Sequence, residues 1–127
     1  VELSRADLRA AELPACDALT LVDVLHYYDA ATQREVLGRA ASALRPGGRL
    51  LLRETDPALR GGARLTRVIE RAAVRLGWNR GPRVTYRPIA ELCADLAALG
   101  LDVTHRPLAA STHPGNVLIT AVRPPTS

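Results

Sequence analysis

The sequence contains no Phe, no Met and no Lys, and its aromatic residues are one Trp and three Tyr. A protein that binds nucleic acid usually gathers its basic residues on one face and often interleaves aromatic side chains among them. Here all 17 basic residues are Arg, and most are scattered along the chain, although the formal net charge is +4. We therefore expect no nucleic-acid partner.

The one dense group of basic residues lies in the middle of the chain. It consists of Arg60, Arg64, Arg67, Arg71 and Arg75. Their spacing follows a helix and favours a solvated helical face. A surface that binds an anionic substrate or a phosphate group is the alternative interpretation.

Cysteine is also rare, because Cys16 and Cys93 are the only two in the sequence and they form no C-x-x-C pair. This spacing is not a metal-ligand pattern, so we predict no metal site. Two lone thiols are typical of buried, reduced cysteines and favour a cytoplasmic location. No apolar run approaches the ~20 residues that span a bilayer. The first residues also lack the apolar block of a secretory signal, and we expect no membrane span.

The length of 127 residues suits one compact domain, and an apolar share of 47% is sufficient for a core. The sequence begins with Val1 and not with Met. We therefore expect a processed, trimmed or excised segment.

A strand, a helix and a second strand form the strongest local pattern. Asp17–Leu25 is apolar on both faces, as expected for a strand of a parallel sheet that is covered on two sides. Asp29 can cap a helix from about Ala30 to Leu44, whose apolar residues repeat at helical spacing. Pro46-Gly47-Gly48 is expected to stop this helix, and Arg49–Arg53 follows as an apolar strand. The pattern predicts a βαβ unit with parallel strands and a right-handed crossover.

The rest of the chain predicts two further helices and two closing strands. Apolar spacing indicates a helix over Leu59–Leu76 and another over Ile89–Leu99, which Pro88 opens. Two extended segments follow, Leu101–Leu108 and Asn116–Val122.

From Asp17 to Asp56 the residues resemble the class I S-adenosylmethionine-dependent methyltransferase family. The stretch reads CDALTLVDVLHYYDAATQREVLGRAASALRPGGRLLLRETD. The family has an Asp at the start of its fourth strand, VLH at the end of that strand, a helix, L-x-PGG-x-L and the fifth strand. NVLITAVRP is similar to the family's last strand. The resemblance identifies residues 1–127 as the C-terminal part of a methyltransferase domain.

The resemblance implies an α/β fold with a partial Rossmann-like sheet, namely strands four to seven with flanking helices and an antiparallel last strand. The family's strand order is 3-2-1-4-5-7-6, and residues 59–87 would be its variable substrate cover. The glycine-rich loop that holds S-adenosylmethionine does not occur in this sequence. We therefore expect an incomplete cofactor site. We also expect the fourth strand to be an exposed edge, which favours self-association or pairing with another chain.

Four residues are candidates for contact with the cofactor. By resemblance, Asp7 and Leu8 lie where the family contacts adenine, and the alternative is that Asp7 caps a short turn. Asp23 and Val24 lie near the end of the predicted fourth strand, where they would face the methionine portion or orient the substrate. A buried carboxylate needs a partner, so an ion pair between Asp23 and Arg53 is the alternative.

His26 follows directly and is the candidate for catalysis. An imidazole beside the methyl-transfer point could act as general base toward a hydroxyl, amine or acid nucleophile. The alternative is a histidine that closes the strand with a backbone hydrogen bond. Tyr27 could line the substrate pocket or pack with its hydroxyl in water.

Arg53 and Glu54 end the next strand, on the substrate side by resemblance. Arg53 could hold a carboxylate or a phosphate group of the substrate through two parallel hydrogen bonds. The alternative is that it forms an ion pair with Asp23 or Glu54.

Two functions are consistent with these residues. The first is S-adenosylmethionine-dependent methyl transfer to a small-molecule or lipid-like acceptor, incomplete without an N-terminal segment. The second is a catalytically inactive, methyltransferase-like module that interacts with a complete subunit or regulates it. Methylation of nucleic acid is disfavoured, because HYYD and not an N-P-P-[YF] motif follows the predicted fourth strand.

Overall fold

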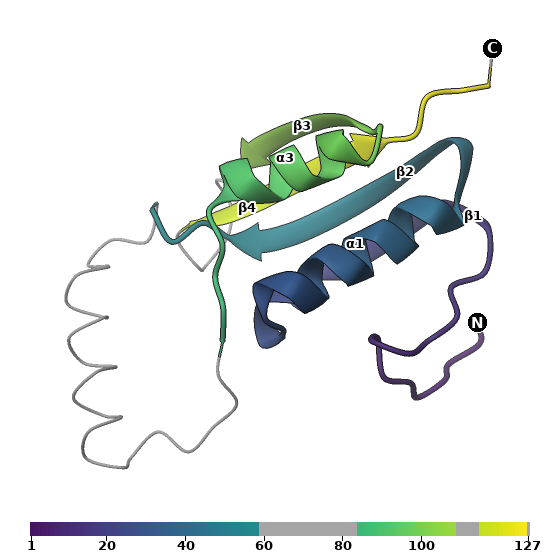
Figure 1. The fold of residues 1–127 in the computed structure, drawn as a ribbon, viewed down its shortest axis with the longest axis horizontal. Coiled ribbons are helices and arrows are strands. Elements are labelled where there is room, and N and C mark those ends of the chain that lie inside the picture. Colours follow the sequence, from purple (N-terminus) through teal and green to yellow (C-terminus); the bar gives the residue numbers. More distant parts are fainter. Residues whose placement is uncertain (59–83, 109–114, 127) are drawn as a thin grey trace.

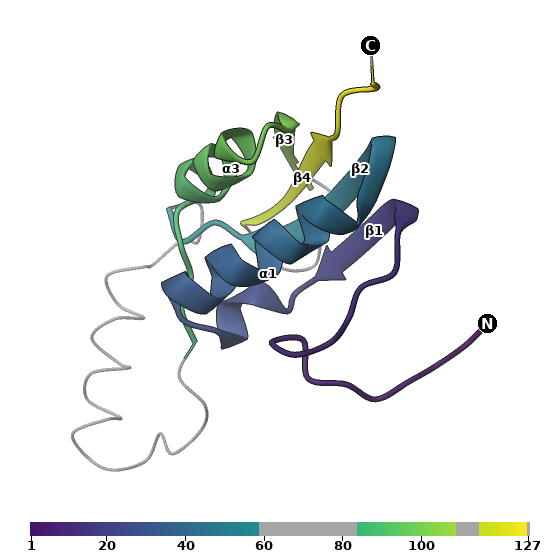
Figure 2. The same ribbon diagram turned by 45° about the vertical axis from the view of Figure 1, so that its right-hand side comes forward.

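The computed structural model describes residues 1–58, 84–108 and 115–126. Over these residues the chain forms one four-stranded sheet, two α-helices and a short 3₁₀ helix. Both α-helices lie on the same face of the sheet (Figure 1, Figure 2). The elements are β1 (Cys16–Val22), η1 (Leu25–Tyr27), α1 (Ala30–Ala43), β2 (Leu44–Thr55), α3 (Ile89–Ala98), β3 (Asp102–Pro107) and β4 (Asn116–Val122).

The strand order in the sheet is β1-β2-β4-β3. β1 and β2 are parallel, as the strand–helix–strand pattern predicts, and Leu21 stands opposite Leu52. β4 runs antiparallel to both of its neighbours, β2 and β3. The expected α/β fold with an antiparallel last strand is therefore confirmed for the described residues.

The hydrophobic core lies between the sheet and the two helices. Alternate residues of β2, Leu50 and Leu52, are fully buried, and so is Ile119 of β4. The helices contribute the apolar residues that recur at helical spacing, namely Val36, Leu37, Ala40, Leu92 and Leu96. Because side chains alternate along a strand, the same parity that buries Leu50 and Leu52 also directs Glu54 toward the helix-covered face.

β1 ends earlier than predicted. The prediction of a strand over Asp17–Leu25 is wrong for its last three residues, because Asp23 has a φ of 55°. This is the left-handed region, which Asp tolerates better than most residues. The Asp23 N–H still donates to the carbonyl oxygen of Arg53 at 3.1 Å. The chain then forms η1, which buries Leu25 and brings His26 beside the end of β2.

The Pro46-Gly47-Gly48 segment lies inside β2 and does not end α1, so that prediction is also wrong. The helix ends at Ala43, and β2 spans Leu44–Thr55 rather than Arg49–Arg53. Residues 45–48 stand opposite Asp17 alone, which makes a bulge in the pairing with β1. Gly48 is needed there, because a Cβ would lie 2.8 Å from the carbonyl oxygen of Arg45.

The second half of the chain agrees with the sequence patterns where it is described. α3 confirms the helix predicted over Ile89–Leu99, and β3 and β4 confirm the two closing strands. The helix predicted over Leu59–Leu76 lies outside the described residues, and so does most of the predicted substrate cover, residues 59–87. Neither α1 nor α3 has the length and apolar composition that would be needed to cross a membrane.

α1 begins at the predicted cap residue. The carboxylate of Asp29 accepts a hydrogen bond from the N–H of Thr32 at 2.8 Å. This bond satisfies one of the free N–H groups of the first turn. It also lowers the pKa of the Asp29 carboxyl below its usual value, because it favours the ionised form.

We expect Asp29→Ala to lower the melting temperature at neutral pH by a few degrees, since it removes the cap. The pKa of Asp29 is lower in the folded chain than in the unfolded one. The stabilisation is therefore present above about pH 4, the usual value for Asp, and disappears as the pH falls through the lower folded pKa. Thermal unfolding followed by circular dichroism at neutral and acidic pH measures this. Asp29→Asn, whose amide oxygen can still accept the bond, is the control. An alanine variant as stable as the parent at neutral pH would contradict the role of the cap.

Candidate active site at the carboxyl end of the sheet

Glu54 lies at the centre of the candidate site, near the carboxyl end of β2. Its side chain takes a core position and is only 4% exposed. One carboxylate oxygen, Oε1, accepts a hydrogen bond from the N–H of Leu25 at 2.9 Å, and Oε2 lies 3.0 Å from Nδ1 of His26. A buried carboxylate is tolerated only when it is paired and hydrogen-bonded. These two contacts therefore explain why Glu54 can occupy a position that would otherwise hold an apolar residue.

His26 is fixed from three sides. Its side chain is 11% exposed, and Nδ1 is within hydrogen-bond distance of the Glu54 carboxylate. The ring of Tyr86 is stacked on the imidazole, with centroids 4.9 Å apart and planes 20° apart. The ring of Tyr27 lies 4.3 Å away at a tilt of 43°. An ionised Glu54 carboxylate can only accept a hydrogen bond, so Nδ1 of His26 carries the ring proton beside it. Nε2 is then the ring nitrogen that can accept a proton.

Gln33 ties three segments together beneath this histidine. It is buried on α1, and its Nε2 donates to the carbonyl oxygens of Tyr28 at 2.9 Å and Thr85 at 3.0 Å. The N–H of Thr85 in turn donates to the carbonyl oxygen of His26 at 2.7 Å. The prediction from sequence did not include Gln33. The signal for it was present, since Gln33 precedes Val36 and Leu37 at helical spacing and is a polar residue on the apolar stripe.

Asp23 and Arg53 form an ion pair with each other, which is the alternative that the sequence left open. Nε of Arg53 also donates to Oδ1 of Asp23 at 3.3 Å. This pairing raises the pKa of the Arg53 guanidinium, chiefly through the side-chain hydrogen bond. A substrate anion at Arg53 would have to compete with Asp23. Val24 is partly buried against the core, and it is the residue before η1.

Asp7 and Leu8 lie in a short turn that is docked on α1. The carboxylate of Asp7 accepts hydrogen bonds from the backbone N–H of Arg9 at 2.9 Å and from its Nη2 at 2.7 Å. The side-chain bond from Arg9 is the main reason why the pKa of Asp7 is lowered to about 2. Arg39 of α1 donates to the carbonyl oxygen of Leu8 at 2.7 Å. Asp7 is thus an exposed, ionised acceptor that also organises its own turn.

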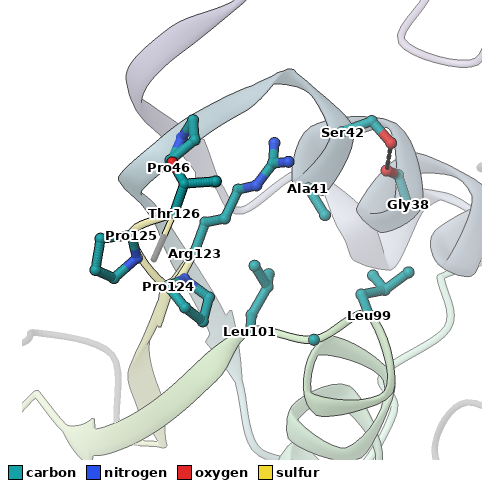
Figure 3. Close-up of a pocket in the computed structure, with 11 residues that line it drawn as sticks. Gly38, Ala41, Ser42, Pro46, Leu99, Leu101, Arg123, Pro124, Pro125 and Thr126 are labelled. Atoms are coloured by element: carbon teal, nitrogen blue, oxygen red, sulfur yellow. Dashed lines mark hydrogen bonds between the residues drawn. The ribbon is translucent and has the colours of Figure 1, made fainter.

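A cavity of about 580 Å³ opens at the other end of the sheet (Figure 3). It lies between the ends of α1 and α3, the start of β2 and the residues after β4. Arg123 extends into it and donates to the carbonyl oxygen of Leu44, just past the end of α1. A cation is stabilised there by the free carbonyls and the negative end of the helix dipole. Pro46 in the cavity wall and Glu54 are eight residues apart on one strand, or about 25 Å. The cavity is therefore separate from the His26 site.

The polar groups around His26 gather beyond the carboxyl ends of two parallel strands, where open α/β sheets bind their ligands. The strand order and the parallel pair β1-β2 correspond to part of the sheet of class I S-adenosylmethionine-dependent methyltransferases. Residues 1–87 match the family model of the O-methyltransferase domain, and the chain belongs to that family.

Several solved structures are similar to the chain. An O-methyltransferase family protein from Burkholderia thailandensis is 26% identical, with a TM-score of 0.67, over 95% of this chain and 34% of its own. Human N-acetylserotonin methyltransferase, solved with S-adenosylmethionine, is 22% identical, with a TM-score of 0.67, over 95% of this chain and 33% of its own. A family 2 O-methyltransferase from Planctomyces limnophilus, solved with apigenin, is 23% identical, with a TM-score of 0.65, over 93% of this chain and 34% of its own.

The last two similarities show the fold alone. The chain spans about a third of the length of each of these proteins. No curated protein matches the chain.

Proposed function

We propose that the chain is the acceptor-side part of an enzyme that transfers a methyl group from S-adenosylmethionine to a hydroxyl oxygen of a small molecule. The observation that carries this proposal is the contact of 3.0 Å between Nδ1 of His26 and the buried carboxylate of Glu54. A histidine oriented by a carboxylate is an arrangement suited to general-base catalysis. The family membership supports oxygen as the atom that is methylated.

The residues of the site would divide the chemistry in a simple way. The cofactor supplies a methyl group on a sulfonium sulfur, which leaves as a neutral thioether. Nε2 of His26 would take the proton from the acceptor hydroxyl, whose oxygen would receive the methyl group that the cofactor supplies. Glu54 keeps the proton of the imidazole on Nδ1 and stabilises the imidazolium that results. We therefore assign Glu54 to the orientation of His26, and not to direct contact with the substrate.

The residues on the cofactor side fit S-adenosylmethionine in part. The exposed, ionised carboxylate of Asp7 is a suitable acceptor for the exocyclic amine of adenine. Asp23 and Val24 lie next to His26 at the end of β1, so this edge is suited to the methionine end of the cofactor. The sequence contains no G-x-G-x-x-G loop. We propose that the cofactor is held fully only when a further segment extends the sheet beside β1.

The exposure of β1 supports the proposal that a further segment extends the sheet beside this strand. In the described residues β1 pairs only with β2. Of the residues of this mostly apolar strand, Leu21 alone is buried, and Val22 is 49% exposed. An apolar edge strand readily pairs with another strand. The same edge favours a second candidate, a catalytically inactive module that docks on a complete subunit.

We expect the 127 residues alone to show no micromolar affinity for S-adenosylmethionine in isothermal titration calorimetry. The physical reason is that only one wall of the cofactor crevice is present in this sequence. A longer polypeptide that adds the glycine-rich loop should bind the cofactor. Micromolar binding by the 127 residues alone would contradict the expectation.

A methyl-transfer assay then separates the two functions. The chain is first combined with the further segment that supplies the glycine-rich loop, and the product is called the complete assembly. This assembly is incubated with S-adenosylmethionine carrying a labelled methyl group and with candidate acceptors such as apigenin, N-acetylserotonin or a lipid-like hydroxy acid. Label on an acceptor oxygen supports the enzyme. Binding to a partner subunit without transfer by any assembly supports the inactive module.

A further inference from the structure

We propose that Tyr86 is a positioning residue for His26, and that the segment 84–87, here called the strap, exists to hold the Tyr86 ring against the imidazole. This inference rests on the proposed role of His26 as general base. It adds a residue that lies far from His26 in the sequence. In Figure 1 and Figure 2 the chain that leads into α3 passes beside the N-terminal end of α1, which η1 precedes in the sequence.

The first step concerns the freedom of the imidazole ring. A single hydrogen bond from Nδ1 to Glu54 fixes one atom of His26, but the torsion next to an aromatic ring has broad wells. The plane of the ring, and therefore the direction of the Nε2 lone pair, needs a second restraint. Tyr86 supplies it, because its ring is stacked at 4.9 Å and 20°. The ring of Tyr27 also contacts the imidazole, but it is tilted by 43°, and Tyr27 is 55% exposed. Tyr27 therefore restrains the plane of the imidazole less strictly than Tyr86 does.

The second step concerns charge. When His26 takes a proton, its ring becomes a cation that lies over the face of Tyr86. A cation is attracted to the face of an aromatic ring. Tyr86 would therefore stabilise the protonated form of His26 on one face, while Glu54 stabilises it at Nδ1.

The third step concerns the way in which the strap is fastened. The N–H of Thr85 donates to the carbonyl oxygen of His26 at 2.7 Å, so the residue before Tyr86 is bonded to the residue that Tyr86 covers. The carbonyl oxygen of Thr85 accepts from Gln33 at 3.0 Å. The backbone of the strap is thus held by both η1 and α1, on the N-terminal side of Tyr86.

Arg87 fastens the other side. It is 5% exposed, and its Nη1 lies 2.7 Å from Oδ2 of Asp95 on α3, in an ion pair that is not an aligned hydrogen bond. Asp95 is also 3.5 Å from Nε of Arg34 on α1. A buried arginine without its carboxylate is strongly unfavourable, so this pairing fixes where the strap can lie. Tyr86 is held between two anchored neighbours.

The test compares Tyr86→Ala with Tyr86→Phe, which keeps the ring, and with Val84→Ala, which changes an exposed strap residue. Nuclear magnetic resonance of the histidine rings is the direct measurement, and the spectrum of His26→Asn identifies the His26 signals. We expect Tyr86→Ala to remove the ring-current shift of the His26 ring protons and to lower the fraction with the proton on Nδ1. Tyr86→Phe and Val84→Ala should retain both.

Activity of the assembly that contains this chain gives the second measurement. We expect Tyr86→Ala to lower kcat by about 3- to 10-fold, the size of one aromatic contact, with KM for the cofactor unchanged and with activity restored in Tyr86→Phe. Unchanged His26 signals in Tyr86→Ala, or an equal loss of kcat in Tyr86→Phe, would overturn the role of the ring. Altered His26 signals without methyl transfer by any assembly would support the positioning role and refute the proposed function. The two failures are therefore distinguishable.

Discussion

Replacement of His26 by Asn should lower kcat for methyl transfer by about 10²- to 10⁴-fold, the usual contribution of a general base. The amide of Asn can still donate to Glu54 from the position of Nδ1, so the carboxylate keeps its partner. What is lost is the nitrogen that accepts the proton of the acceptor hydroxyl. The measurement is transfer of a labelled methyl group by the complete assembly, with kcat and KM determined separately.

The matched control is His105→Gln, because His105 lies on β3 and is exposed. It should leave kcat unchanged. KM for the acceptor should change little in His26→Asn, since the histidine acts on the proton in the transition state rather than on binding. If His26→Asn kept most of its activity, the acceptor would have to be ionised before it binds. Alignment alone would then account for catalysis.

The parts of the fold that depend on local signals could be predicted from the sequence. α1 follows from Asp29 at its cap and from an apolar stripe at helical spacing, both of which lie within a few residues of each other. The two closing strands follow from apolar residues and turns. The parallel pairing of β1 and β2 follows from the helix between them, since a helix of this length is the usual crossover between two parallel strands.

The parts that were predicted wrongly depend on contacts between distant residues. Asp23 ends β1 by taking a positive φ, and its partner is Arg53, thirty residues later. The pairing with Arg53 was among the alternatives left open by the sequence, but the apolar run through Leu25 gave no sign of the positive φ. Gly48 looked like part of a turn, yet it lies in β2, where a Cβ would be 3.1 Å from the carbonyl oxygen of Asp17 on the neighbouring strand. Such requirements exist only once the strands are assembled.

The site shows the same division. His26 could be chosen from the sequence because of its place after the predicted strand. The position of Glu54 against it could have been inferred from strand parity, since Leu50, Leu52 and Glu54 face the same side. The position of Tyr86 against His26 could not be inferred, because this contact joins segments 60 residues apart. Nothing in the spacing of residues 84–87 indicates that they return to the end of β1.

Glu54→Gln is the sharper test of how the pair works, because it changes the direction of one hydrogen bond and little else. The amide can keep an oxygen toward the N–H of Leu25, which preserves the buried contact at 2.9 Å. Its NH₂ group then faces Nδ1 of His26, so Nδ1 must accept and the proton moves to Nε2. A protonated Nε2 cannot act as a base, and we expect kcat to fall by up to about 10⁴-fold, the size seen when a catalytic histidine is held in the wrong tautomer.

Glu54→Ala should behave differently, because it leaves the N–H of Leu25 buried without a partner. A buried donor in that state destabilises the fold by about 1–3 kcal/mol, whereas Glu54→Gln should unfold at nearly the same temperature as the parent. Glu35→Gln, at an exposed position of α1, is the control for loss of a negative charge. The double variant His26→Asn with Glu54→Gln decides whether the residues act as a unit. If Glu54 works only through His26, the double variant is no slower than His26→Asn alone. If instead the two substitutions lowered kcat by independent factors that multiply in the double variant, Glu54 would act on the substrate directly.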